Sequence, residues 1–243
     1  MGGPAVAALS LALAAVAARP TPARVPATCG TGEGAYLNGP RSSRNVALTF
    51  DLCPTSSRPG FSRCVLETLV DAHVPATFFV TGTWAGTHPR ELKQLARVPF
   101  FDIGMHGLQH LALKTEPEAV IAAQIDGDAR RLRSLGVKPV RLFRPPYGST
   151  REEVAEVARR LGVKVVLWDV VSGDADPKIK SEAIDREVLR RVKGGSIVIL
   201  HANHEGSATE DALPVMIRAL QAKGFSFVTV RKLLAECDTG GGK

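Results

Sequence analysis

The sequence predicts an α/β fold, a distorted (β/α) barrel of about seven parallel strands. From Asn45 onward, short apolar runs alternate with amphipathic stretches, a pattern typical of parallel strands joined by helical crossovers. No linker or change of composition interrupts this alternation. The chain has 243 residues, a length that single barrels reach, and its 44% of hydrophobic residues is enough for a sizeable core.

Strands are expected where short runs of apolar, β-branched and aromatic residues stand between turn-forming residues. In chain order they are residues 45–50, 75–82, 100–104, 141–143, 163–168, 196–200 and 225–230. Helices are expected where apolar residues recur at a spacing of three or four. They cover residues 61–73, 88–96, 116–136, 150–162, 180–195, 208–224 and 231–236.

The N-terminal part of the chain divides into two segments ahead of the folded domain at 45–237. Residues 1–23 resemble a secretory signal, although no Lys or Arg precedes their apolar core. That core, Ala5–Ala18, is too short to span a bilayer comfortably, so no stable membrane span is expected. Residues 24–44 are rich in Gly, Pro, Ser and Thr and are expected to be irregular. We therefore expect a secreted or periplasmic protein.

The net charge of +7 favours contact with acidic surfaces or polymers, or reflects a general basic bias of the proteome. The sequence has no block of like charges and no basic run interleaved with aromatic residues. Nucleic acid is therefore not an expected partner.

The four cysteines permit two disulfides if the protein is exported. Of the three possible pairings we favour Cys29 with Cys237, which flank the body of the chain, and Cys53 with Cys64, which are close in sequence. The alternative is four free thiols.

Reactive side chains collect directly after the predicted strands. In barrels of this kind the carboxyl ends of the strands form the functional rim. The residues there are Asp51, His106, His110, Arg144, Tyr147, Trp168, Asp169 and His201. Each of them alone also fits a structural role, as a surface acid, a core histidine or an exposed arginine. Their shared position at one rim favours a functional site.

Two of these groups have a spacing that indicates chemistry. His106 and His110 are four residues apart, so that on a helical turn both imidazoles would face one metal. Arg144 is followed by two prolines and Tyr147. The prolines stiffen the turn and fix the directions in which Arg144 and Tyr147 point.

The ordered set Thr49-Phe-Asp51, His106-x-x-x-His110, Arg144-x-Pro-Tyr, Trp168-Asp and Ile199-Leu-His resembles the five motifs of the polysaccharide deacetylase family, with its NodB-like domain. The match runs from about Asn45 to His201. The resemblance implies a distorted (β/α) barrel and the metal-dependent removal of N-acetyl groups from amino sugars.

The first motif departs from the family pattern Thr-Phe-Asp-Asp-Gly-Pro, in which the first Asp is the general base and the second is the third metal ligand. Here the second Asp is replaced by Leu52 and the Gly by Cys53. Three interpretations follow. In the first, which we favour, His106 and His110 hold the metal together with Asp51 or water. In the second, Cys53 adds a thiolate; two imidazoles and a thiolate suit zinc, but a Cys53–Cys64 disulfide would preclude this site. In the third, the protein has lost both metal and activity.

The resemblance implies a role for each residue at the rim. A divalent metal on His106 and His110, for which we expect zinc, would activate the amide and a water, and Asp51 would take the proton. Arg144 would hold Asp51 ionised. His201 would protonate the amine.

The remaining rim residues would assist these steps. Asp169 would keep His201 charged. The backbone N–H of Tyr147 would stabilise the oxyanion, and Trp168 would form an apolar wall against the acetyl methyl group.

The implied partner is an N-acetylated glycan: chitin-like, peptidoglycan or poly-N-acetylglucosamine. Two alternatives use the same scaffold. One is a glycan-binding cell-envelope protein without catalysis and with little or no metal, which Leu52 supports. The other is an amidase acting on a non-sugar substrate, since a family resemblance does not fix the substrate.

Overall fold

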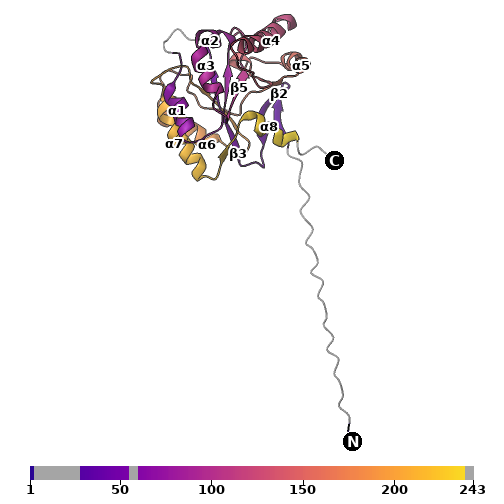
Figure 1. The fold of residues 1–243 in the computed structure, drawn as a ribbon, viewed down its shortest axis with the longest axis vertical. Helices are drawn as coiled ribbons and strands as arrows, with labels where there is room; N and C mark the ends of the chain where they lie inside the picture. The colour runs from indigo at the N-terminus through magenta and orange to yellow at the C-terminus, as the bar shows by residue number, and fades with distance from the viewer. Residues whose placement is uncertain (3–27, 55–59, 239–243) are drawn as a thin grey trace.

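The computed structural model describes residues 1–2, 28–54 and 60–238, and within them a parallel sheet curls into a half-barrel with helices around it (Figure 1). The strand order is β7-β6-β5-β4-β3-β9-β8, and β10 pairs with β3. The predicted distorted (β/α) barrel is confirmed. The segment expected to be a signal lies, from residue 3 on, outside the described residues.

The strands of this sheet all run parallel to their neighbours. They are β3 (Asn45–Leu52), β4 (Ala76–Val80), β5 (Phe101–Met105), β6 (Leu142–Phe143), β7 (Lys164–Val165), β8 (Val170–Val171), β9 (Ile197–His201) and β10 (Ser226–Phe227). β8 was not predicted; it is two residues long and directly follows the predicted Trp168-Asp169 pair.

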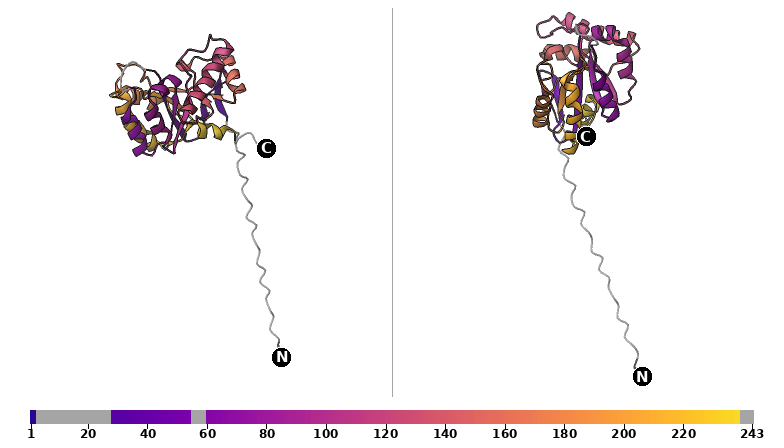
Figure 2. Two further views of the ribbon diagram at one scale, coloured as in Figure 1. Left: turned by 45° about the horizontal axis from the view of Figure 1, so that its top comes forward. Right: turned by 90° about the vertical axis from the view of Figure 1, so that its left-hand side faces the viewer.

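Helices connect the strands and flank the sheet (Figures 1 and 2). They are α1 (Arg63–Asp71), α2 (Gly82–Thr87), α3 (Pro89–Ala96), α4 (Glu118–Ser134), α5 (Glu152–Arg160), α6 (Ser181–Arg191), α7 (Ala208–Ala222) and α8 (Val230–Asp238), with a 3₁₀ turn at Pro146–Gly148. Only α2 lacks a counterpart among the predicted helices. Thr81 is the N-cap of this short helix, and its hydroxyl accepts a hydrogen bond from the backbone N–H of Trp84.

Residues 29–40, expected to be irregular, form an antiparallel hairpin of β1 (Cys29–Gly32) and β2 (Ala35–Pro40). Glu33 and Gly34 both have positive φ, as a two-residue hairpin turn requires. β2 is bridged to Val166 beyond β7 and to Ser196 before β9. The hairpin is thus held by contacts distant in sequence, which its Gly-rich composition does not reveal.

The cysteines follow one of the two expected pairings. Cys29 and Cys237 form a disulfide that ties the hairpin to α8. The expected Cys53–Cys64 pairing is wrong, because both thiols are free: Cys53 is buried directly after β3 and Cys64 is exposed on α1. Closeness in sequence does not bring the two side chains together.

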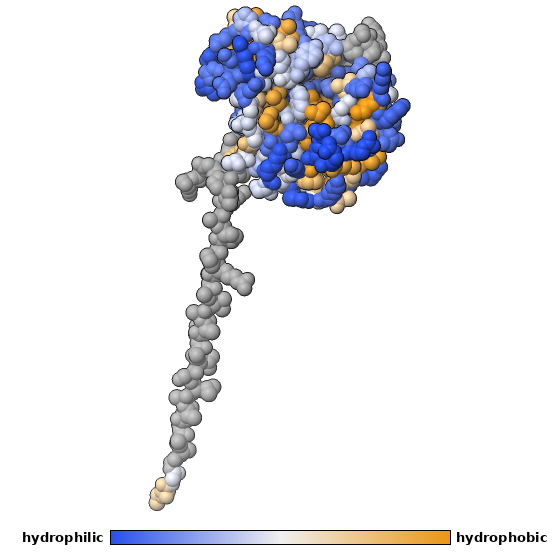
Figure 3. All heavy atoms as spheres, turned by 180° about the vertical axis from the view of Figure 1, so that it is seen from behind, coloured by the Kyte–Doolittle hydropathy of each residue, from blue (hydrophilic) through white to orange (hydrophobic). Residues whose placement is uncertain are grey.

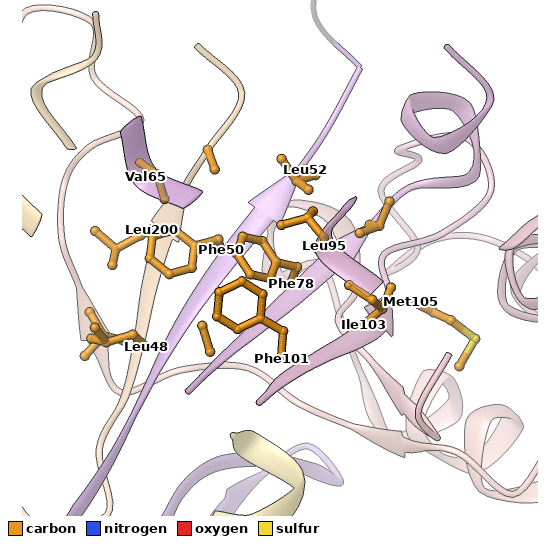
Figure 4. Packing of buried hydrophobic residues seen from close by; sticks show 14 of the residues in the cluster. Leu48, Phe50, Leu52, Val65, Phe78, Leu95, Phe101, Ile103, Met105 and Leu200 are labelled. Carbon is orange, nitrogen blue, oxygen red and sulfur yellow. The ribbon is translucent and has the colours of Figure 1, made fainter. Parts of the chain in front are cut away.

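Strand β3 alternates its side chains between two apolar layers. Leu48, Phe50 and Leu52 pack into the large cluster between sheet and helices (Figure 4). Ala47 belongs to the smaller cluster inside the barrel, which residues of α8 close from below. Asp51 lies an even number of residues after Ala47 on the same strand, so its side chain also faces the barrel interior.

Leu52 is fully buried in the outer cluster, so its side chain points away from the barrel interior. The position that the family motif gives to the third metal ligand is thus occupied here by a buried apolar side chain. Phe50 and Phe78 stack in the same layer with ring centroids 5.3 Å apart.

The face of the molecule seen in Figure 3 is largely hydrophilic, with apolar side chains scattered among polar ones. None of the helices in the described ranges combines the length and hydropathy needed to cross a bilayer.

Replacing Leu52 by Asp should lower the free energy of unfolding by about 3–5 kcal/mol, because it removes a buried apolar side chain and buries an unpaired acid. Leu52→Met, which conserves volume, should cost less than about 1.5 kcal/mol. Urea unfolding of both variants measures the difference. A fully stable Leu52→Asp protein that binds zinc more tightly than wild type would contradict this orientation of Leu52.

Candidate active site

A cavity of about 310 Å³ opens at the carboxyl ends of the strands. It is lined by Asp51, Cys53, His106, His110, Tyr147, Trp168, Val171, Ser172, Gly173, Asp174, Ala175, Ile199 and His201. Six of the eight predicted site residues are in this lining. A larger hollow of about 890 Å³ lies beside α4 and contains none of them.

Arg144, the seventh predicted residue, lies fully buried beside Asp51. Its Nη1 donates to Asp51 Oδ1 at 2.7 Å and to Thr49 Oγ1 at 2.9 Å. The guanidinium also lies 4.1 Å from the centre of the Phe79 ring, a cation–π contact. The arginine is thus locked in one position, and it fixes one oxygen of Asp51.

This pairing keeps Asp51 ionised. Burial by itself would raise the pKa of Asp51, but the Arg144 guanidinium, through its charge and its hydrogen bond, outweighs burial and holds the pKa below its ordinary value, and His201 acts in the same direction. The second oxygen, Oδ2, lies 3.6 Å from His106 Nε2. Asp51 therefore presents a charged, partly free carboxylate to the cavity.

The two histidines of the predicted pair face each other, with ring centroids 5.1 Å apart. His106 Nδ1 lies 2.7 Å from the carbonyl oxygen of Arg144, to which it donates, so Nε2 keeps its lone pair toward the cavity. Burial lowers the pKa of His106, and burial with the neighbouring His106 lowers that of His110 to about 4. Both imidazoles are neutral near pH 7, the form that binds metals.

Cys53 completes a group of three donors. One ligand atom each from Cys53, His106 and His110 all lie within 4.8 Å of one another. Burial and the charge of Asp51 raise the pKa of the Cys53 thiol, which is therefore protonated without a metal. Two imidazoles and one sulfur are a donor set that fits zinc, so the residues present suit a metal even without the missing carboxylate.

The expected pairing of Asp169 with His201 is wrong. Asp169 instead binds Arg41 at 2.7 Å, the Ser196 hydroxyl at 2.9 Å and the Ile197 N–H at 2.8 Å. These bonds anchor the start of β9 and turn the carboxylate away from the cavity. The position of Asp169 next to Trp168 in the sequence did not indicate that its carboxylate points away from the cavity.

The acid that pairs with His201 is Asp174. Its Oδ1 lies 2.9 Å from His201 Nδ1, and its Oδ2 accepts from the His201 backbone N–H and from Thr209. Burial alone would lower the pKa of His201, but the hydrogen bond and charge of Asp174 raise it above the ordinary value. Sequence reasoning missed Asp174; its place in the loop after Trp168 was the available signal.

Tyr147 stands at the mouth of the cavity with 70% of its side chain exposed. Its φ is 60°, in the left-handed region, which costs a non-glycine residue roughly 1–2 kcal/mol. Its ring meets that of His110 edge-on at 4.4 Å. The stiff proline turn therefore holds Tyr147 in a strained conformation beside the histidines, as functional sites often do.

Comparison with known proteins agrees with this geometry. The family model described as polysaccharide deacetylase matches residues 38–166. A peptidoglycan-N-acetylglucosamine deacetylase of Bacillus cereus is 32% identical over 200 residues, which are 80% of this chain and 90% of the relative. A peptidoglycan-N-acetylmuramic acid deacetylase of Bacillus subtilis is 29% identical, over 83% of this chain and 76% of the relative.

Two solved structures extend the comparison. A pseudoenzyme of carbohydrate esterase family 4 from Bacillus anthracis superposes with a TM-score of 0.77 at 27% identity, covering 85% of this chain and 70% of that one. A family 4 carbohydrate esterase from Streptomyces lividans, solved with acetate, has a TM-score of 0.66 at 27% identity, covering 79% and 92%.

Replacing Asp174 by Asn should lower the pKa of His201, because it removes the charge that offsets burial. NMR titration of the imidazole resonances measures the shift. Asp169→Asn is the matched control and should leave the pKa of His201 unchanged. If the Asp169 variant shifts His201 and the Asp174 variant does not, the pairing described above is refuted.

Proposed function

The chain belongs to the polysaccharide deacetylase family, hydrolases of amide C–N bonds, and we propose that it is an exported, metal-dependent N-deacetylase of peptidoglycan amino sugars. The observation that carries the proposal is one cavity that holds Asp51, paired with Arg144, and His201, paired with Asp174, beside the imidazoles of His106 and His110. The signal-like residues 1–23 support export, and the names of the relatives support the substrate.

The surroundings of Asp51 and His201 shift their pKa values in opposite directions. Arg144 lowers the pKa of Asp51 and Asp174 raises that of His201, which favours Asp51 as the group that accepts a proton and His201 as the group that donates one. Pairs of groups whose pKa values are pushed apart in this way are typical of acid–base catalysis.

A divalent metal held by His106 and His110 would polarise the amide carbonyl and lower the pKa of a water molecule. Asp51 takes the proton of the water that attacks the carbonyl carbon. Arg144 keeps the Asp51 carboxylate aimed during this step, through the bond to Oδ1.

His201 then protonates the amine nitrogen as the C–N bond breaks, and acetate and a free amino sugar are released. Asp174 holds the imidazole in the orientation that this transfer needs. The Tyr147 backbone N–H donates to the carbonyl oxygen as that oxygen gains negative charge.

The cavity has the size and lining for a small acyl group. Trp168, Val171 and Ile199 form an apolar part of the lining, against which the acetyl methyl group would pack. Exposed Tyr147 at the mouth offers a ring face to the sugar.

A second candidate function is glycan binding without catalysis. It is favoured by the lack of the second carboxylate in the first motif and by the likeness to a family 4 pseudoenzyme. Acetate release from purified peptidoglycan by the zinc-loaded protein separates the two, with chitin oligomers as a comparison substrate and a small non-sugar acetamide as a test for amidase activity. Zinc binding without acetate release from any of them would exclude the deacetylase.

Asp51→Asn should abolish acetate release, since Asn retains the size of the side chain but cannot accept a proton. We expect a loss of at least about 100-fold, the lower end for general base catalysis. Circular dichroism checks that the variant is folded. Near-normal turnover in a folded Asn variant would remove Asp51 from the role of base.

His106→Ala and His110→Ala should each release bound metal, because each removes one of few protein ligands. Atomic absorption of the dialysed variants measures the metal per chain, and His73→Ala, on an exposed turn after α1, is the control. Unchanged metal content in both site variants would show that these histidines are not ligands.

A further inference from the structure

We infer that Cys53 is the third protein ligand of the metal, as a thiolate, so that this chain carries a two-histidine, one-cysteine centre selective for zinc. The inference rests on the proposed metal-dependent function and names the donor that takes the place of the missing carboxylate. It follows from the position of Cys53 in the fold and from the fact that the other nearby donor, Asp51, is already bound to Arg144.

The direction of Cys53 is set by the alternation of β3. Leu52 points into the outer core, and the next residue therefore turns back to the interior, on the side of Asp51. Cys53 is 8% exposed and lines the cavity. Its backbone N–H donates to Asn203 Oδ1 at 2.9 Å, which fixes the backbone just beyond the strand.

The sulfur is close to both imidazoles and is chemically available. The ligand atoms of Cys53, His106 and His110 lie within 4.8 Å of one another, a spacing that a small inward shift brings to metal-bonding distance. The thiol is not in a disulfide. His106 Nδ1 is engaged by the Arg144 carbonyl, which leaves Nε2 to bind.

The other nearby donor is already occupied. Asp51 Oδ1 accepts from Arg144 at 2.7 Å, and the proposed mechanism needs the remaining oxygen as a base. Leu52 has no donor atom. Within the described ranges, Cys53, His106 and His110 are the His, Cys, Asp or Glu residues that meet the spacing of a metal group.

A thiolate changes which metal the site prefers. Binding replaces the thiol proton by the metal: Cys–SH and Zn²⁺ give the zinc thiolate and one H⁺. The net charge is that of a site with one carboxylate and two neutral imidazoles. A thiolate is softer than a carboxylate, however, so zinc should be favoured over magnesium and manganese.

X-ray absorption at the zinc edge of the wild-type protein tests the inference without any substitution. We expect one sulfur scatterer at about 2.3 Å with nitrogen or oxygen at about 2.0–2.1 Å. A shell of nitrogen and oxygen alone would overturn the assignment.

A pair of variants gives a second readout. Cys53→Ser should weaken zinc binding by at least 10–100-fold, the loss seen even when an outer partner of a ligand is removed. It should also abolish the thiolate-to-metal absorption of the cobalt-loaded protein. Cys64→Ser is the matched control, because Cys64 is free and exposed, and it should change neither. Equal zinc affinity and equal spectra in both variants would overturn the proposal.

The acetate assay keeps this inference separate from the proposed function. Acetate release by a zinc protein that has no sulfur ligand would refute the role of Cys53 and leave the deacetylase standing. A zinc–sulfur centre with no acetate release would support Cys53 and refute the deacetylase.

Discussion

The alternation of side chains along β3 is the constraint on which the site depends. β3 is paired with β4 on one side and with β9 on the other, so its register is fixed from both edges. A slip of one residue would exchange the two faces of the strand and carry Asp51 into the apolar core. Because the outer face is anchored by three large apolar side chains, the inner face presents Asp51, and Cys53 beyond it, to the cavity.

Arg144 links this strand to the rest of the site. It is fully buried, and its charge is compensated by Asp51, by the Thr49 hydroxyl, by the Leu167 carbonyl and by aromatic ring faces. Such a buried pair is weak evidence for stability, because desolvation of both ions opposes their attraction. Its consequence here is chemical: the same residue fixes the base through its side chain and orients His106 through its carbonyl.

Periodicity in the sequence predicts the barrel, most of its helices and the rim at which the reactive groups meet, because parallel strands bring their carboxyl ends together. Periodicity does not predict features that are determined by contacts between residues far apart in the sequence. The 29–40 hairpin, the free thiol of Cys53 and the pairing of Asp174 with His201 depend on residues far away in the chain. The burial of Leu52 in the outer core, in contrast, agrees with the alternating spacing of Leu48, Phe50 and Leu52 along the sequence.

The most direct test of this account is a crystal structure of the zinc-loaded protein with anomalous scattering recorded on both sides of the zinc edge. The account predicts one peak bonded to His106 Nε2, His110 and Cys53 Sγ, with Asp51 still held by Arg144 and Leu52 still in the outer core. A peak bonded to Asp51 and not to Cys53, or no peak in this cavity, would contradict it.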